Sequence, residues 1–128
     1  QPNVPHVAEF VADIRKKTGG HVPTARTWFG FASAWTCALA AANAKSLDTV
    51  KMAKALQGFK LPPEIALMPK DTVYREGDNQ LMPTLYVGHA QAKGKDDPED
   101  LFVVDMEVDG SKAAPSVADT GCKMTWPA

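Results

Sequence analysis

The stretch TWFGFASAWTCALAAANA, residues 27–44, decides the fold of this chain. Its large apolar side chains recur three or four residues apart, which is the spacing of one face of an α-helix. The stripe consists of Trp28, Phe31, Ala32, Trp35, Leu39 and Ala42. The opposite side carries mostly small residues, and a helix that is apolar or small nearly all round is usually buried on several sides. We therefore expect a long helix in the middle of a core.

Two shorter helices are expected on either side of the long one. The first covers about residues 5–18, where apolar side chains recur at helical spacing until two glycines end the pattern. Residues 21–26 connect this helix to the long one. A third helix should begin after Ser46, a good N-cap residue, and should end at Gly58.

The second half of the chain has the patterns of β-strands. Leu61-Pro62-Pro63 cannot continue a helix, and we expect strands beyond it. The candidates are residues 71–75, residues 81–92, in which Pro83 indicates an edge or a strand start, and residues 101–108. The order is thus helices first and then two or three strands.

The last strand candidate alternates cleanly, which predicts that one set of apolar side chains shares a face. This set is Phe102, Val104, Met106 and Val108. The polar residues 90–100 before it contain four acidic residues and are typical of a solvated loop. They lack the glycine and the terminal glutamate that a calcium-binding loop requires.

The charge and the cysteines exclude several classes of protein. The chain has 128 residues and a formal net charge of −1, so no basic surplus indicates nucleic acid as a partner. The cysteines and histidines stand at no metal-ligand spacing, and we expect neither a metal nor a cofactor. Cys37 is either a buried free cysteine or the partner of Cys122 in a disulfide, which an oxidising compartment would permit.

Four motifs occur in a fixed order along the chain. They are FVADIRKKTG at residues 10–19, WFGFASAW at 28–35, SLDTVKMAKALQG at 46–58 and YREGDNQ at 74–80. This ordered set resembles the C-terminal region of type I periplasmic solute-binding proteins of the branched-chain amino acid ABC transporter family. The resemblance covers roughly residues 5–90.

The resemblance implies an α/β fold in which residues 1–128 are the C-terminal portion of a two-lobed, doubly wound protein whose upstream lobes are absent here. The implied function is that of the substrate-binding component of an ABC importer. Such a protein captures a small organic solute, such as an amino acid or an aromatic carboxylate, and delivers it to the permease subunits. The resemblance further implies a periplasmic protein that is not an enzyme and whose parent chain carries a signal peptide.

The best candidate ligand-binding residues are Arg26, Thr27, Trp28 and Phe29. They stand where a connector enters a helix, and free N–H groups and the positive end of the helix dipole favour an acidic group there. The resemblance supports this place, since family members often have a ligand contact just before this helix. The alternative is that Trp28 and Phe29 are core residues. Asp78 and Gln80 either hold a turn or contact ligand, and we prefer the turn.

Two other functions remain open, and so does the assembly of the chain. One is a ligand-sensing domain of the same fold in a receptor or regulator, and the less favoured one is an enzyme, for which no cluster of titratable groups is evident. The helices carry more apolar surface than two or three short strands can cover. We therefore expect Trp28, Phe31 and Trp35 to be buried partly through a second copy, as a homodimer.

Overall fold

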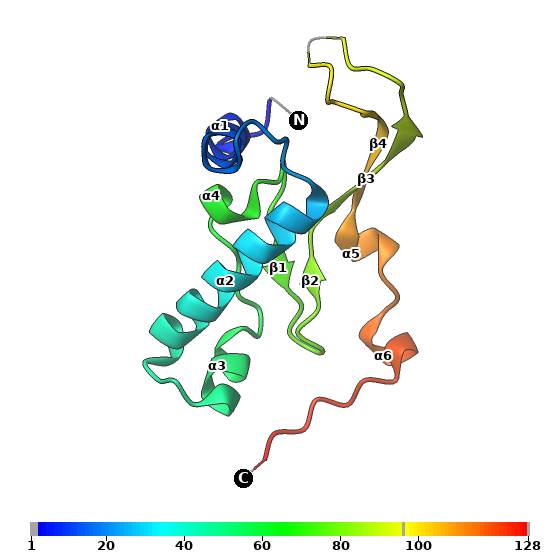
Figure 1. The fold of residues 1–128 in the computed structure, drawn as a ribbon. Helices are drawn as coiled ribbons and strands as arrows, with labels where there is room; N and C mark the ends of the chain where they lie inside the picture. Colours follow the sequence, from blue (N-terminus) through cyan, green and yellow to red (C-terminus); the bar gives the residue numbers. More distant parts are fainter. Residues whose placement is uncertain (1–2, 96, 128) are drawn as a thin grey trace.

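The computed structural model of the chain describes residues 3–95 and 97–127 and mixes helices with small sheets (Figure 1). The helices are α1 Val7–Thr18, α2 Ala25–Ala44, α3 Thr49–Ala55, α4 Pro63–Ala66, α5 Gly110–Ala113 and α6 Val117–Thr120. The strands are β1 Val73–Tyr74, β2 Leu81–Met82, β3 Thr84–Ala90 and β4 Phe102–Asp109. The expected mixed class is confirmed, and the three expected helices precede the strands, together with the short helix α4, which was not expected.

The ends of the first three helices follow from local chemistry. Gly19 ends α1 with a positive φ of 74°, which a residue without Cβ adopts easily. The N–H of Thr24 donates to Oγ1 of Thr27 at 3.1 Å, and this bond fixes the start of α2. The expected cap of α3 was wrong by two residues. Asp48, rather than Ser46, accepts the free N–H of Lys51 at 2.9 Å.

The double proline does not continue α3, as expected, and it also begins a further short helix. Pro63 is the first residue of the short helix α4, where a residue without an N–H group costs nothing and has a suitable φ. Strand structure begins only at β1, ten residues later. The first strand predicted, residues 71–75, contains β1, but the helical turn of α4 before it was not predicted.

The core lies between α2 and the segment around α4. Its buried cluster is Trp28, Ala32, Leu61, Ile65, Ala66 and Leu67. The indole Nε1 of Trp28 donates to the backbone oxygen of Ile65 at 3.1 Å and joins the two helices. Along α2 the buried residues are Trp28, Ala32, Thr36 and Ala40, which is a narrower stripe than the sequence predicts. Trp35 remains 47% exposed.

The strands form two separate antiparallel pairs, β1 with β2 and β3 with β4. Pro83 separates β2 from β3 and thus marks a strand start, as expected. In Figure 1 the β3–β4 hairpin rises beside the helices, and the chain after α6 runs back below them. There Lys54 of α3 lies 5.7 Å from the ring centre of Trp126.

The single-face prediction for β4 was wrong because the hairpin contains a β-bulge. Val87 pairs with Met106, whereas Gly88 pairs with Val104, so Asp105 is an extra residue in β4. Side chains of directly paired residues lie on the same face of a sheet. Met106 and Val108 therefore share a face with Val87, while Phe102 and Val104 share the opposite face with Gly88.

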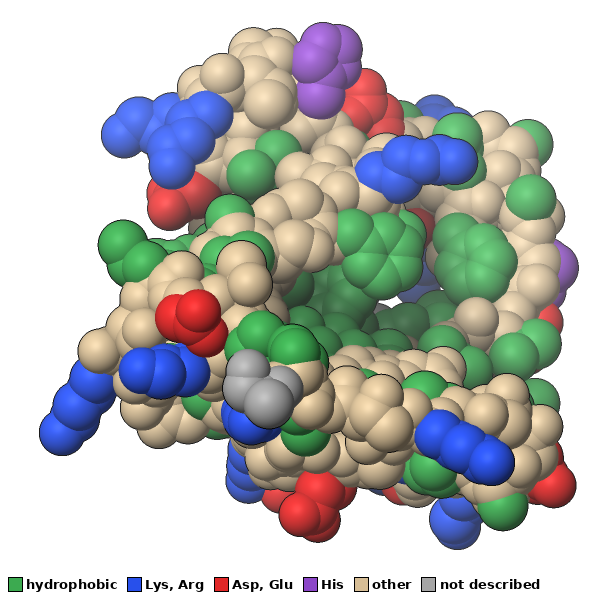
Figure 2. All heavy atoms as spheres, turned by 90° about the horizontal axis from the view of Figure 1, so that it is seen from below, with side chains coloured by type: hydrophobic (Ala, Val, Ile, Leu, Met, Phe, Trp, Pro, Cys, Tyr) green, Lys and Arg blue, Asp and Glu red, His purple; other side chains and the backbone are tan. Residues whose placement is uncertain are grey.

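Large apolar side chains remain exposed on both halves of the molecule. They are Phe29, Trp35, Leu47, Leu85, Val87, Leu101, Phe102 and Met106. In the view from below, Figure 2 shows a hollow with hydrophobic walls. Of the three aromatic residues expected to need a second copy for burial, this single chain buries Trp28 and leaves Trp35 exposed. No helix within residues 3–95 and 97–127 combines the length and apolarity of a membrane span.

Candidate functional site

The four predicted ligand-binding residues occupy the first turn of α2 and differ in exposure. Arg26 is exposed, Thr27 is half-buried, and Phe29 is 55% exposed. Trp28 is buried in the core, with its ring centre 5.2 Å from that of Phe29. The core alternative therefore describes Trp28, while the side chains of Arg26 and Phe29 are accessible to a solute.

The backbone at this helix start narrows the possible contacts with an anion. The N–H of Trp28 donates to the oxygen of Thr24 at 3.2 Å and is not free to meet a carboxylate. The first N–H groups of a helix have no carbonyl partner within it. Those of Ala25 and Arg26, at the positive end of the dipole, are thus the better donors to an acidic group.

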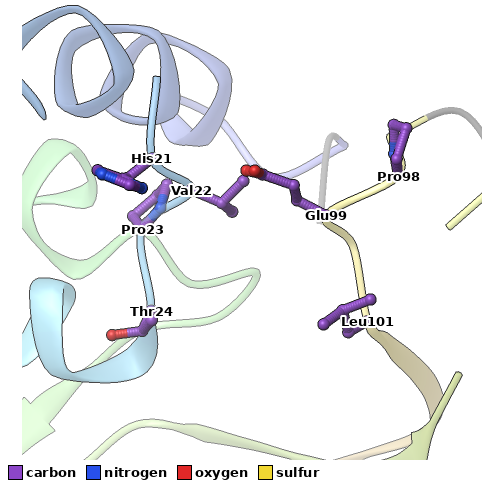
Figure 3. Close-up of a pocket in the computed structure, with 7 residues that line it drawn as sticks. All are labelled: His21, Val22, Pro23, Thr24, Pro98, Glu99 and Leu101. Carbon is purple, nitrogen blue, oxygen red and sulfur yellow. The ribbon is translucent and has the colours of Figure 1, made fainter. Parts of the chain in front are cut away.

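An open groove of about 530 Å³ lies directly before this helix start. Figure 3 shows its two sides, one from the connector between α1 and α2 and the other from the end of the β3–β4 loop. The lining residues are His21, Val22, Pro23, Thr24, Pro98, Glu99 and Leu101. The groove thus joins segments that are more than seventy residues apart in the sequence.

The loop side of the groove is held in place by polar contacts. Arg15, near the end of α1, forms an ion pair with Asp97. Within the loop, Gln91 Nε2 donates to the oxygen of Asp100 at 2.8 Å, and the N–H of Asp100 donates to the oxygen of Asp97 at 3.0 Å. A side chain at Gly94 would collide with the oxygen of Asp97, so the loop folds tightly there. Asp96 lies outside the described residues.

The groove combines apolar walls with one carboxylate. Val22, Pro23 and Leu101 supply apolar surface, and the carboxylate of Glu99 points across toward Val22 (Figure 3). The ring of His21 points away from Glu99. A carboxylate accepts hydrogen bonds from an ammonium group. The arrangement therefore suits a small solute with an apolar body and a cationic group, close to a helix start that favours an anionic group.

The start of α2 can be predicted from the sequence as a candidate site, but the groove cannot. Residues 21–26 appeared only as a connector, and residues 90–100 only as a solvated loop. Near the groove, the loop is linked to α1 by the Arg15–Asp97 ion pair, whose partners are 82 residues apart. No spacing pattern signals such a pair. Thr24 is the residue that links the groove to the predicted first turn, because it lines the groove and precedes α2.

Other candidate residues have structural roles. Asp78 accepts hydrogen bonds from Nε of Arg75 at 3.0 Å and from the N–H of Gln80 at 3.1 Å. It therefore holds a turn, which is the role that we preferred over a ligand contact. Cys37 and Cys122 are both free and exposed, so neither the buried position nor the disulfide considered for Cys37 is found. Within the described residues, no group of histidine, cysteine and acidic side chains could hold a metal ion.

Comparison with known proteins identifies no relative: no family model, no curated protein and no solved structure matches this chain.

Proposed function

We propose that this chain is the C-terminal portion of a two-lobed, doubly wound solute-binding protein that serves an ABC importer in the periplasm. It would capture a small organic solute, an amino acid or an aromatic carboxylate, and pass it unchanged to the permease subunits. The observation that carries the proposal is the groove of about 530 Å³ directly before α2. Solute sites in doubly wound proteins lie at the carboxyl ends of strands and near helix starts, and the helix start beside this groove is the feature that supports the proposal.

The uncovered apolar surface supports the idea that further lobes belong to the intact protein. Trp35 is 47% exposed on α2, and Val87 and Met106 are about half exposed on one face of the hairpin. Large contiguous apolar patches on soluble proteins mark contact surfaces. Upstream lobes would cover these side chains. A second copy of the chain is the other way to cover them.

An amino acid fits the chemistry of the groove better than a simple carboxylate does. Its ammonium group would meet Glu99, and its apolar side chain would lie against Leu101 and Val22. Its carboxylate would lie near the first N–H groups of α2, those of Ala25 and Arg26, in the turn where the side chain of Arg26 is exposed. Phe29 does not line the groove but is exposed in the same first turn of α2, and a solute that extends along this helix start would contact it.

Calorimetry on the full-length protein tests this proposal with two matched probes. Phenylalanine carries the ammonium group, and 3-phenylpropionate lacks it. We expect Glu99→Gln to weaken phenylalanine binding about tenfold, which is the effect of losing one charge-assisted hydrogen bond. Binding of 3-phenylpropionate should not weaken, because this probe has no N–H group that could donate a hydrogen bond to Glu99. Phe29→Ala should weaken both probes.

Glu76→Gln is the matched control. Glu76 is an exposed acidic residue in the β1–β2 turn, and its substitution removes the same charge as Glu99→Gln does. The proposal fails if neither probe binds. It also fails if Glu76→Gln weakens phenylalanine as much as Glu99→Gln does, since the effect would then come from net charge and not from the groove.

A further inference from the structure

A second groove lies on the helical side of the molecule, away from the one at the start of α2. Its volume is about 220 Å³. It is built from α1, α2 and α4 together with the residue before α1, and its lining is His6, Glu9, Phe10, Asp13, Ile14, Lys17, Phe31 and Glu64. We name it the Phe10–Phe31 groove after the two aromatic residues that it contains.

The apolar part of this groove is anchored in the protein. The rings of Phe10 and Phe31 lie with centres 5.0 Å apart at an angle of 54°. Both residues are half-buried and pack against the core cluster on one side. The ring faces of such residues are electron-rich and attract cations. The groove therefore offers a surface that suits an aliphatic stem ending in a positive charge.

The rim is acidic. Glu9 and Asp13 come from α1 and Glu64 from the first turn of α4, whereas Lys17 is the only lysine of the lining. Within residues 3–95 and 97–127, neither Asp13 nor Glu64 takes part in an ion pair, and Glu9 contacts only His6, at 3.4 Å. Three carboxylates thus face one lysine and one histidine, and the rim keeps an excess of negative charge.

We propose that the Phe10–Phe31 groove is a docking site for a basic segment of a partner protein, whose arginine or lysine side chain inserts into it. Long cationic side chains lay their aliphatic stems on apolar surface and keep their charged heads at its edge. The two phenylalanines would contact the stem, and Glu9, Asp13 and Glu64 would surround the head. This charge complementarity selects a cationic partner segment, and the inference does not depend on the proposed solute site.

Fluorescence anisotropy with a short labelled peptide tests the proposal on the full-length protein. The peptide carries two arginines beside a leucine, and the comparison peptide carries citrulline in place of each arginine. We expect the arginine peptide to bind and the citrulline peptide to bind at least about tenfold more weakly, because citrulline keeps the shape but lacks the charge. The triple variant Glu9→Gln, Asp13→Asn and Glu64→Gln should weaken the arginine peptide by a similar factor.

A charge-matched variant separates the groove from net charge. The control is a second triple variant, which removes three exposed carboxylates elsewhere: Glu76→Gln, Asp100→Asn and Glu107→Gln. Its affinity for the arginine peptide should stay within about twofold of that of the unsubstituted protein, at a salt concentration that screens long-range charge effects. Equal weakening by both triple variants overturns the proposal, and so does equal binding of the two peptides. Free arginine competing as well as the peptide would also overturn it, because the site would then take a small cation and not a protein segment.

Discussion

At the scale of single residues, Arg75 links the turn between β1 and β2 to a distant segment of the chain. Arg75 forms an ion pair with Asp78, donates to Oε1 of Gln80 at 3.1 Å and donates to the oxygen of Pro115 at 2.7 Å. One guanidinium thus fixes both a local turn and the segment before α6. This explains the YREGDNQ motif without a ligand.

The same cluster predicts how stability depends on pH. The hydrogen bond from Arg75, followed by that from the N–H of Gln80, lowers the pKa of Asp78 below its usual value, although partial burial opposes this. A carboxyl group with a lowered folded-state pKa stabilises the fold above its unfolded-state pKa of about 3.9. That stabilisation is lost as pH falls through the lowered value.

Urea unfolding between pH 7 and pH 2 checks this prediction. The original chain should lose stability as pH falls below about 4, and Asp78→Asn should be less stable at pH 7 with a flatter decline on the acid side. If Asp78→Asn keeps the acid decline of the original chain unchanged, the Arg75–Asp78 pair contributes nothing to pH dependence.

At the scale of elements, the β3–β4 hairpin depends on its bulge. Because Asp105 is an extra residue, the side chains before it and after it in β4 alternate out of step. The carboxylate of Asp105 lies 2.9 Å from Nδ1 of His89 on the neighbouring strand. A Cβ at Gly88 would collide with the oxygen of Val103, so the close approach of the strands at the bulge requires glycine. The bulge and Gly88 are therefore one feature.

Substitution of two glycines by alanine tests this dependence. Gly88→Ala should destabilise the chain by about 1–3 kcal/mol, because the backbone must shift to remove the collision. Gly30→Ala is the matched control. Its Cβ in α2 would meet no atom within 4 Å, and alanine in a helix interior should stabilise by about 0.5–1 kcal/mol. Denaturant midpoints measure both, and similar midpoints for the two variants would contradict the role given to Gly88.

At the scale of the whole molecule, the exposed apolar side chains determine what the chain does in solution. Leu85, Val87 and Met106 lie on one face of the hairpin with exposures of 43%, 49% and 53%, and Phe29 and Trp35 are exposed on α2. Contiguous apolar surface of this kind marks a contact surface. In the proposed solute-binding protein the upstream lobes would cover it, and for the chain alone a second copy would cover it.

The chain alone should therefore self-associate as its concentration rises. Light scattering after gel filtration should give a mass above 13.8 kDa, and the double variant Val87→Lys and Met106→Lys should shift it toward the monomer. Leu47→Lys is the control, since Leu47 is 85% exposed but lies between α2 and α3, away from the hairpin. A monomer at every concentration would sink the prediction that a homodimer covers this surface.

The sequence by itself determined the mixed helix and strand class, the three leading helices and the turn at Asp78. These features depend on contacts between residues close in the chain. Helical spacing, the glycines after α1 and the side-chain bonds of the turn act within a few residues. For the same reason Trp28 could be assigned to an apolar stripe before its partner Ile65 was known.

Only the tertiary structure decided the faces of β4, the burial along α2 and the two grooves. The bulge arises from the pairing of β4 with β3, and a shift of one residue reverses the face of every later side chain. The groove before α2 forms where the β3–β4 loop meets the connector, near the Arg15–Asp97 ion pair. Trp35 has the same helical spacing as Trp28, but the described residues leave it 47% exposed. Periodicity shows which side chains can be buried, and burial itself depends on which distant segment packs against them.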